Sequence, residues 1–299
     1  MNILLLGKNG QVGWELQRAL APLGNLIALD RHSTAYCGDL GSPEEIAQTI
    51  RAIKPDVIVN AAAYTAVDKA ESEPELAQVV NATSVEIIAK EAQRCGAWVV
   101  HYSTDYVFPG TGSDSWSEND TPSPLNIYGE SKLAGEHALQ QYCRQHLIFR
   151  TSWVYANQGN NFAKTMLRLA KERNELSVIH DQFGAPTGAE LLADCTAHAI
   201  RVAQHHPEVA GLYHLAASGV TTWYEYAEFV FQEARQAEIE LALHTLKPIL
   251  SRDYPLPAKR PNNSRLNTEK FQQRFDLILP SWEIGVKRML HELFLTTSY

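Results

Sequence analysis

The stretch Asn2-Ile3-Leu4-Leu5-Leu6-Gly7-Lys8-Asn9-Gly10-Gln11-Val12-Gly13 decides the fold of this chain. It opens with a short apolar run, which is typical of a buried parallel strand, and a helical pattern follows from Trp14. Its glycines have G-x-x-G-x-x-G spacing, and glycine lets backbone amides approach a pyrophosphate at a helix N-terminus. The spacing alone is common by chance, so the flanking strand and helix carry the prediction. We expect cofactor contacts from Gly7, Asn9, Gly10, Gln11, Val12 and Gly13.

A second apolar run, residues 25–29, ends in Asp30, 17 residues after Gly13. The carboxylate that binds an adenosine ribose usually follows the glycines by about 20 residues. Arg31 comes next, and a guanidinium there can meet the 2′-phosphate of NADPH. An acid beside a base therefore predicts that both NADH and NADPH are accepted, although Asp30 could also be an ordinary aspartate at a strand end.

Apolar runs alternate with helical patterns through the first half of the chain. Further strands are expected at residues 56–63, 97–102 and 147–153. A Ser-Pro-Glu-Glu signal at residues 42–45 opens a helix before the first of these strands. Residues 64–92 have a mostly helical pattern. This alternation predicts an α/β fold with a doubly wound, Rossmann-like parallel sheet.

The second half of the chain is more mixed, with strand-like runs near 176–179 and 211–215 among helical segments. We expect a dinucleotide-binding Rossmann domain over residues 1–154. Residues 155–299 should form mainly a smaller, mixed substrate-binding domain, with segments of about 176–216 returning to the Rossmann sheet.

Polar residues with catalytic potential follow the strand at residues 97–102. Ligands bind at the carboxyl ends of strands in open parallel sheets, and Thr104 stands at such an end, 24 residues before Tyr128. Tyr128 and Lys132 are four residues apart, so a helix places them on one face. A nearby ammonium lowers the pKa of a phenol, so the pair predicts an acid/base device. The same spacing also fits an ordinary solvated helix face.

Composition excludes several classes of function. The 299 residues carry a net charge of −8 with no Lys/Arg block, which argues against nucleic acid as a partner. No apolar stretch approaches the roughly 20 residues that span a membrane. The four cysteines form neither a CxxC motif nor a His-Cys cluster. We therefore expect a soluble enzyme with free thiols in the cytoplasm.

These motifs together resemble the short-chain dehydrogenase/reductase superfamily in its extended branch. The chain is more similar still to the family of dTDP-4-dehydrorhamnose reductases, and the resemblance covers nearly its whole length. It rests on residues 7–13, Asn60-Ala61-Ala62-Ala63-Tyr64-Thr65-Ala66-Val67-Asp68, Ser103-Thr104-Asp105-Tyr106-Val107-Phe108, Tyr128-Gly129-Glu130-Ser131-Lys132, Arg150-Thr151-Ser152-Trp153-Val154-Tyr155 and Arg260-Pro261.

The resemblance implies NADH- or NADPH-dependent reduction of dTDP-4-dehydro-β-L-rhamnose to dTDP-β-L-rhamnose, an activated sugar for cell-surface polysaccharides. Tyr128 would be the general acid, Lys132 would lower its pKa and hold the nicotinamide ribose, and Thr104 would bond the substrate carbonyl. The family also implies a homodimer and bound Mg²⁺, for which no acid spacing here names ligands. Further cofactor contacts are expected from Asp39, Leu40, Ala62, Ala63, Tyr64, Thr65, Tyr128 and Lys132, and substrate contacts from Thr104, Asp105, Tyr128, Trp153 and Arg260.

Three other functions share this scaffold. Sugar-nucleotide 4,6-dehydratases place a glutamate after Thr-Asp as the base, whereas Tyr106 stands there in this chain. An epimerase would use the Tyr/Lys pair without net consumption of cofactor. A regulatory subunit would bind dinucleotide without turnover, but the Thr104–Tyr128–Lys132 set argues against it.

Overall fold

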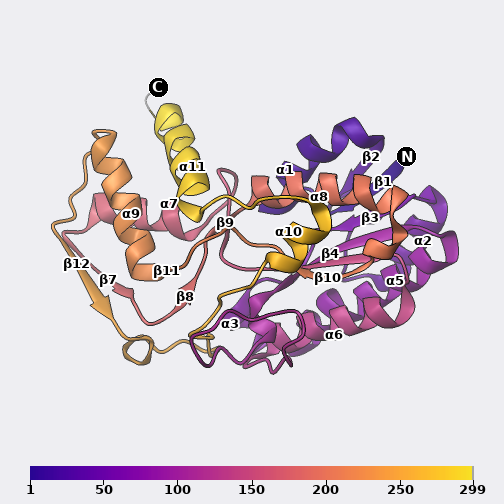
Figure 1. Ribbon diagram of the computed structural model, residues 1–299, viewed down its shortest axis with the longest axis horizontal. Coiled ribbons are helices and arrows are strands. Elements are labelled where there is room, and N and C mark those ends of the chain that lie inside the picture. Colours follow the sequence, from indigo (N-terminus) through magenta and orange to yellow (C-terminus); the bar gives the residue numbers. More distant parts are fainter. Residues whose placement is uncertain (298–299) are drawn as a thin grey trace.

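A parallel six-stranded sheet forms the centre of the larger of two lobes in the computed structural model, which describes residues 1–297 (Figure 1). Its order is β10-β5-β4-β3-β1-β2, and every pairing is parallel. This confirms the predicted doubly wound α/β sheet. Its strands are β1 (Asn2–Leu6), β2 (Asn25–Leu29), β3 (Val57–Asn60), β4 (Trp98–Thr104), β5 (His146–Thr151) and β10 (Gly211–His214).

The order of the strands reverses direction at β1. Leu4 of β1 pairs with Ile27 of β2 on one side and with Ile58 of β3 on the other. Chain connections therefore leave β1 and β3 toward opposite edges of the sheet, which opens a crevice at their carboxyl ends. Gly7 follows β1, and Thr104 ends β4 on the same side of the sheet.

Helices cover both faces of this sheet because its strands are apolar on both faces. Ile3 and Leu5 pack in the cluster that includes α1 and α8, and Leu4 and Leu6 pack in the cluster that includes α2 and α5; all four are 0% exposed. One face carries α1 (Gln11–Leu20), α8 (Ala189–His205) and α10 (Glu269–Phe275), and the other carries α2 (Pro43–Ile53), α5 (Ser84–Cys95) and α6 (Ile127–Tyr142).

The segment predicted as mostly helical, residues 64–92, is divided into pieces. A proline begins α4, and the chain then widens into a π-helical turn before α5. The turn has a structural role: its buried Asn81 donates to the Tyr64 carbonyl and to Ser131 Oγ of α6, each at 3.0 Å. The pieces are α3 (Val67–Ala70), α4 (Pro74–Gln78) and the π turn Val79–Thr83.

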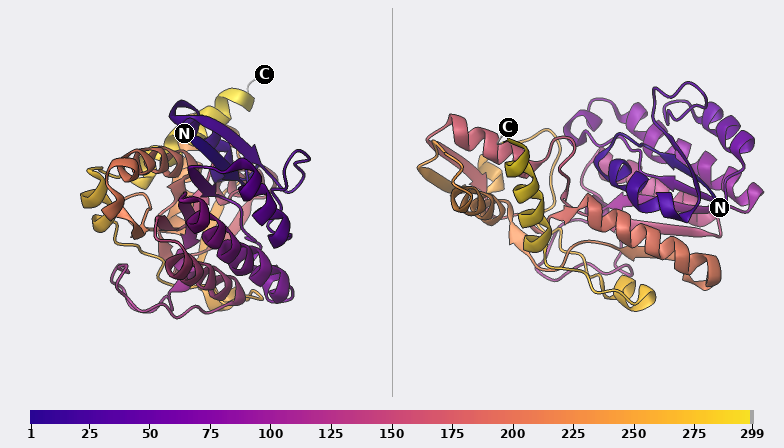
Figure 2. Two further views of the ribbon diagram at one scale, coloured as in Figure 1. Left: turned by 90° about the vertical axis from the view of Figure 1, so that its right-hand side faces the viewer. Right: turned by 90° about the horizontal axis from the view of Figure 1, so that it is seen from above.

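The smaller lobe packs three helices around its own apolar core, beside the two-stranded sheet of β7 and β12 (Figures 1 and 2). The C-terminal helix extends to Thr297. The elements are α7 (Phe162–Glu172), α9 (Trp223–Gln236), α11 (Trp282–Thr297), β7 (Glu175–Ile179), β12 (Thr245–Ile249), β6 (Val154–Tyr155) with β9 (Thr187–Gly188), and β8 (Phe183–Gly184) with β11 (Thr221–Thr222).

The chain crosses between the lobes more than once. β10 lies at the edge of the large sheet, whereas β7 pairs with β12 in the smaller lobe. The division at residue 154, with about 176–216 returning to the large sheet, stays a prediction. None of the helices within residues 1–297 combines the length and the apolarity that crossing a membrane would require. Single 3₁₀ turns lie at Ala21–Leu23, Asp105–Val107, Pro207–Val209 and Ser251–Asp253.

Candidate active site

The glycine loop packs its backbone so tightly that side chains cannot replace Gly7 or Gly13. Gly7 has φ +88°, and a Cβ there would lie 2.7 Å from the Ala62 nitrogen. A Cβ on Gly13 would lie 2.0 Å from the Gly7 carbonyl oxygen. Gly10 caps α1 without a side-chain hydrogen bond, so the first amides of this helix stay available to an anion. This geometry fits the pyrophosphate of a dinucleotide.

Asp30 is held at the end of β2 as an ionised acceptor. Its carboxylate accepts hydrogen bonds from Ser33 Oγ at 2.9 Å, from the His32 amide at 3.0 Å and from the Asn9 side chain. Burial raises the pKa of Asp30, but these hydrogen bonds outweigh it and lower the pKa below its ordinary value. Arg31 is exposed, and its Nε lies 3.1 Å from His32 Nε2.

One cation near Asp30 was missed from the sequence. Lys8 Nζ lies 3.5 Å from Ser33 Oγ, in the glycine loop that faces the end of β2. The sequence did not indicate this contact, because the direction of the Lys8 side chain depends on how the loop folds back onto β2.

The other predicted cofactor residues lie in the segments that follow β2 and β3. Ala62 and Ala63 are half-buried, and the Ala62 amide donates to Asn60 Oδ1 at 3.2 Å. Asp39 accepts from the Gly41 amide at 2.9 Å, and Leu40 is buried. Tyr64 and Thr65 follow, with the Tyr64 hydroxyl turned toward Glu73 at 2.5 Å and Thr65 exposed.

Thr104 and Tyr128 come together at the carboxyl end of β4. Thr104 Oγ1 accepts from the Tyr106 amide at 3.1 Å and donates to Asp105 Oδ1 at 3.2 Å, and it lies close enough to the Tyr128 hydroxyl to lower the pKa of that phenol. Tyr128 sits in the first turn of α6, which Asn126 caps by accepting from the Gly129 amide at 2.8 Å. The Tyr106 ring packs edge-on against Tyr128, with ring centroids 5.7 Å apart. The sheet and the helix cap therefore place two hydroxyls side by side.

In this structure Lys132 does not lower the pKa of Tyr128 as expected. Desolvation raises the pKa of Tyr128 to about 12, and the charge of Asp105 adds to it, while the nearby Thr104 hydroxyl acts in the opposite direction. The Lys132 amino group is directed elsewhere: Nζ lies 2.6 Å from the Tyr102 carbonyl oxygen and 3.1 Å from His101 Nε2. Lys132 is only 2% exposed, and burial lowers its pKa to about 8.

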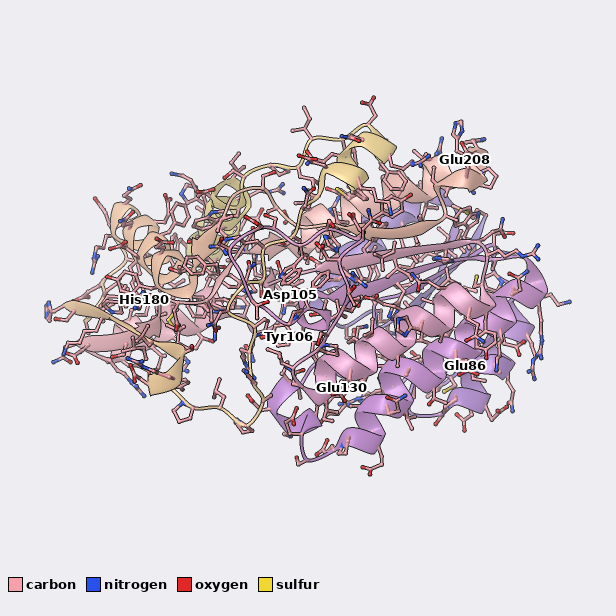
Figure 3. All side chains as sticks on the ribbon, turned by 60° about the horizontal axis from the view of Figure 1, so that its bottom comes forward. Glu86, Asp105, Tyr106, Glu130, His180 and Glu208 are labelled. Carbon is pink, nitrogen blue, oxygen red and sulfur yellow. The ribbon has the colours of Figure 1, made fainter. Side chains whose placement is uncertain are left out.

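Asp105 is a buried carboxyl of the site. Figure 3 shows it beside Tyr106 at the junction of the lobes. Burial raises the pKa of Asp105 to about 7, although hydrogen bonds from Ser264 and Thr104 oppose that shift. A carboxyl of this kind can accept or donate a hydrogen bond near neutral pH.

Trp153 reaches the site from the connection between the lobes in a constrained backbone conformation. Its φ is +50°, which is unusual for a residue with a side chain. Its ring stacks on Trp223, with centroids 3.6 Å apart and planes at 15°. On Gly184, a Cβ would lie 2.8 Å from Trp153 Cε2. Trp223 was missed from the sequence because it lies 70 residues away from its partner.

Arg260 forms an ion pair across the lobes. Its Nη2 lies 2.7 Å from Asp68 Oδ2, and Asp68 also accepts from the Ala258 amide at 3.2 Å. Asp68 therefore binds the loop that carries Arg260. The pair lowers the pKa of Asp68 in spite of the desolvation that raises it.

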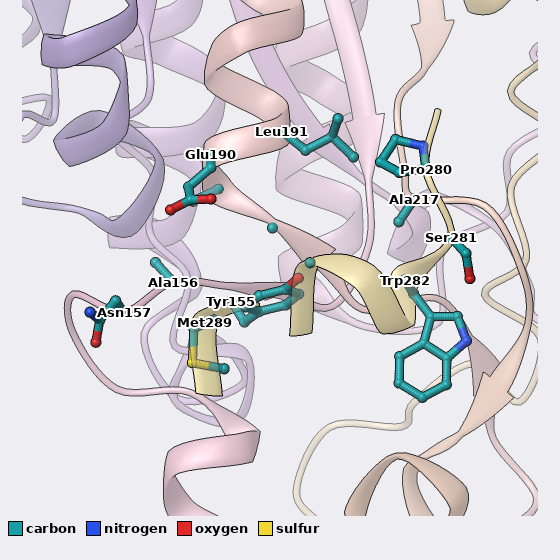
Figure 4. Close-up of a pocket in the computed structure, with 13 residues that line it drawn as sticks. Tyr155, Ala156, Asn157, Glu190, Leu191, Ala217, Pro280, Ser281, Trp282 and Met289 are labelled. Atoms are coloured by element: carbon teal, nitrogen blue, oxygen red, sulfur yellow. The ribbon is translucent and has the colours of Figure 1, made fainter. Parts of the chain in front are cut away.

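A small cavity of about 50 Å³ lies apart from these residues (Figure 4). Tyr155, Glu190 and Trp282 are among its lining residues, and the catalytic candidates are not. Among residues 1–297, no three His, Cys, Asp or Glu side chains are grouped as a metal site. We therefore assign no ligands and no chemical step to the Mg²⁺ that the resemblance implied.

Comparisons with known proteins agree with this geometry. Residues 1–295 match the family described as RmlD substrate binding domain. A dTDP-4-dehydrorhamnose reductase of Escherichia coli K12 is 74% identical over 298 residues, with 100% of each chain covered. That of Burkholderia thailandensis is 46% identical, with 98% of this chain and 99% of the relative covered.

Solved structures show the same relationship. The crystal structure of dTDP-4-dehydrorhamnose reductase from Bacillus anthracis in complex with NADP has a TM-score of 0.86 at 36% identity, covering 97% of this chain and 99% of that one. A dTDP-glucose 4,6-dehydratase from Streptomyces venezuelae has a TM-score of 0.78 at 17% identity, covers 100% of this chain and 98% of that one, and shares the fold alone. The chain belongs to the family of dTDP-4-dehydrorhamnose reductases, NAD(P)H-dependent oxidoreductases with the extended short-chain dehydrogenase/reductase fold.

Proposed function

We propose that this chain reduces the C4 ketone of dTDP-4-dehydro-β-L-rhamnose to the alcohol of dTDP-β-L-rhamnose. The observation that carries the proposal is the placement of the Thr104 and Tyr128 side chains together at the end of β4, with buried Lys132 one helical turn further on. This group lies at the carboxyl edge of the sheet next to the glycine loop, in a chain 74% identical to a reductase of that name.

The cofactor would be held by the glycine loop and by Asp30, with Lys8 and Arg31 near the 2′-position of the adenosine ribose. When bound, the reduced nicotinamide supplies the hydride. Asp30 accepts from ribose hydroxyls, and the two cations offset its repulsion of a 2′-phosphate. The proposal therefore includes the use of both NADH and NADPH.

Tyr128 is the proton donor in this proposal. A phenol with a pKa near 12 stays protonated at neutral pH, which a general acid requires. The carbonyl oxygen becomes an alkoxide as it is reduced, and an alkoxide is more basic than a phenolate, so proton transfer from Tyr128 is favourable. Thr104 donates a second hydrogen bond to the same oxygen. Lys132 as an ammonium stabilises the phenolate that remains and holds the nicotinamide ribose.

The substrate side would be formed by Asp105, Trp153 and Arg260. The Arg260 guanidinium uses two of its nitrogens on Asp68 and the Ala258 carbonyl, and its remaining N–H groups are donors for a diphosphate oxygen. Trp153 offers a flat apolar face to the sugar.

Tyr106 argues against the dehydratase alternative. Elimination of water needs a base at that position, and burial raises the pKa of Tyr106, so its hydroxyl stays protonated at neutral pH. A regulatory subunit would not need a desolvated lysine one helical turn from Tyr128, with Thr104 at the end of the adjacent strand. The epimerase alternative is separated by the assay below because an epimerase consumes no cofactor.

The deciding assay mixes purified chain with dTDP-4-dehydrorhamnose and NADPH or NADH, and follows loss of the reduced-nicotinamide absorbance. We expect one dTDP-rhamnose for each nicotinamide oxidised. Formation of a 4-keto-6-deoxy sugar from dTDP-glucose, with cofactor only catalytic, would contradict the reductase assignment. The homodimer, the cytoplasmic location and the domain division at residue 154 also stay predictions; light scattering of the purified chain tests the first.

A further inference from the structure

His101 and Asn60 form a buried polar group behind the catalytic lysine that the reaction scheme above does not use. Both stand near the carboxyl ends of adjacent strands, where they pair in register between β3 and β4, and each is 1% exposed. Asn60 Nδ2 lies 3.1 Å from His101 Nδ1, and His101 Nε2 lies 3.1 Å from Lys132 Nζ. A histidine inside the apolar run Val99–Tyr102 is therefore explained by its contact with Lys132.

The hydrogen bonds assign the imidazole tautomer when Lys132 is an amine. Asn60 Oδ1 accepts the Ala62 backbone N–H at 3.2 Å, which only the amide oxygen can do. The Asn60 NH₂ group therefore faces His101 Nδ1, which must offer its lone pair. A neutral imidazole then carries its proton on Nε2 and donates it to the lone pair of an amine at Lys132. Lys132 in turn donates to the Tyr102 carbonyl at 2.6 Å, so every group has a partner.

The ammonium form of Lys132 cannot satisfy the same set of bonds. An ammonium has no lone pair, so Nε2 of His101 must become the acceptor and the proton must move to Nδ1. Nδ1–H would then face the Asn60 NH₂ group, donor against donor. Rotation of the Asn60 amide repairs that contact but turns its NH₂ group toward the Ala62 N–H. One buried hydrogen bond is lost in either case.

We propose that His101, with its tautomer set by Asn60, is a positioning residue that holds the Lys132 amino group and couples its protonation state to the imidazole tautomer. Its kinetic consequence rests on the proposed function of Lys132. Burial lowers the pKa of Lys132 to about 8, and burial together with the Lys132 charge keeps His101 neutral. Lys132 can therefore change charge close to the working pH.

The other charges around this pair are accounted for. Glu136 of α6 raises the pKa of Lys132, and its carboxylate forms a buried ion pair with Arg150 of β5 at 2.6 Å. The Tyr102 hydroxyl points away, to Thr196 Oγ1 at 2.6 Å. Asp105 acts on Tyr128 and Tyr106. The substitution that changes the tautomer preference with the least change in shape is therefore at Asn60.

Asn60→Asp is the test, because a carboxylate has two acceptor oxygens. One can accept from the Ala62 N–H and the other from His101 Nδ1–H, which leaves the Nε2 lone pair for an ammonium. The substitution therefore favours charged Lys132, and the carboxylate charge acts in the same direction. In the reductase assay, we expect the alkaline limb of the pH profile of kcat to move to higher pH by about one unit or more. A uniform loss of kcat with an unmoved limb would overturn the proposal.

His101→Gln is the conservative comparison. Its amide can rotate to offer oxygen to an ammonium or NH₂ to an amine, so activity should persist and the alkaline limb should again move upward. His101→Leu, which offers neither group, should lose both activity and cofactor affinity. Equal kinetics and an unmoved limb for the Gln and Leu variants would mean that His101 only fills space, which contradicts the proposal.

A spectroscopic measurement tests the tautomer without turnover and without the Asn60→Asp variant. In protein labelled with ¹⁵N-histidine, the His101 signal is identified by its loss in His101→Gln. Above the Lys132 pKa, we expect Nε2 protonated and Nδ1 unprotonated. His214 is an internal reference of the opposite kind, because its Nδ1 lies 3.0 Å from the Trp116 carbonyl and must carry the proton. His101 with Nδ1 protonated under these conditions would overturn the proposal, whereas a wild-type chain without reductase activity would overturn only the proposed function.

Discussion

The two sides of the active site are built by different means. The proposed cofactor side is formed by main chain that is packed against itself: Gly7 and Gly13 leave no space for a Cβ, and the first amides of α1 are the proposed donors to the cofactor. The proposed substrate side is formed by side chains that are held by contacts across long sequence distances, such as Trp153 on Trp223 and Arg260 on Asp68. Backbone geometry tolerates almost no substitution, whereas side-chain contacts can be weakened in steps. Mutations on the two sides should therefore have different effects on stability, cofactor affinity and KM.

The largest effect is expected where the two sides meet. Tyr128→Phe removes the proton donor, so kcat should fall by about 10²–10⁴-fold, while cofactor and substrate affinity change little. Stopped-flow turnover and fluorescence titration with NADPH measure the two quantities. Tyr102→Phe is the matched control, because its hydroxyl bonds Thr196 outside the site. Near-normal turnover in Tyr128→Phe would show that Tyr128 is not the general acid.

Gly13→Ala should break the cofactor side as a unit. Its Cβ would lie 2.0 Å from the Gly7 carbonyl, so the loop must shift, at a cost of about 3 kcal/mol in the free energy of unfolding. NADPH affinity should fall with it. Gly10→Ala is the control, because its Cβ would lie 3.4 Å from the same oxygen. Urea unfolding measures the free energy of unfolding of both variants. Equal destabilisation would mean that the close approach of residue 13 to the Gly7 carbonyl does not explain the need for glycine.

On the substrate side the loss should be graded and confined to KM. Trp223→Leu removes the ring on which Trp153 stacks, and an aromatic pair is worth roughly 0.5–1.5 kcal/mol, so KM for the sugar nucleotide should rise up to about tenfold. Cofactor affinity should stay unchanged. Phe229→Leu, which loses a ring contact with Trp282 in the same lobe, serves as the control. A fall in NADPH affinity would show that the two sides are coupled.

The smallest effect concerns the exposed edge of the cofactor side. Arg31→Ala should weaken NADPH by about fivefold and NADH by less, because an exposed charge pair contributes about 1 kcal/mol at most. The ratio of the two dissociation constants is the measurement, and NADH is the internal control. Equal weakening of both cofactors would mean that Arg31 does not face the 2′-phosphate.

The sequence predicted local features well because local interactions produce them. The first five strands of the large sheet, the glycine turn and the first helix follow from the period of apolar residues and from glycine spacing. The one-turn spacing of Tyr128 and Lys132 is confirmed on α6. Residues 64–92 are mostly helical as predicted, but tertiary contacts decide how this segment is divided: Asn81 of its π turn bonds the Tyr64 loop and Ser131.

By itself, then, the sequence determined the strand–turn–helix unit, the α/β class and the identity of the candidate acid and its lysine. Only the tertiary structure decided what these groups touch. Tyr128 lies beside Thr104, the Lys132 amino group contacts His101, and Arg260 pairs with Asp68 across 192 residues. The physical reason is that periodicity encodes which face of an element is buried, whereas the order of strands in the sheet and the packing of the lobes decide which distant side chains meet. Burial then shifts the pKa values of the side chains that meet, and residue spacing in the sequence does not predict how deeply each one is buried.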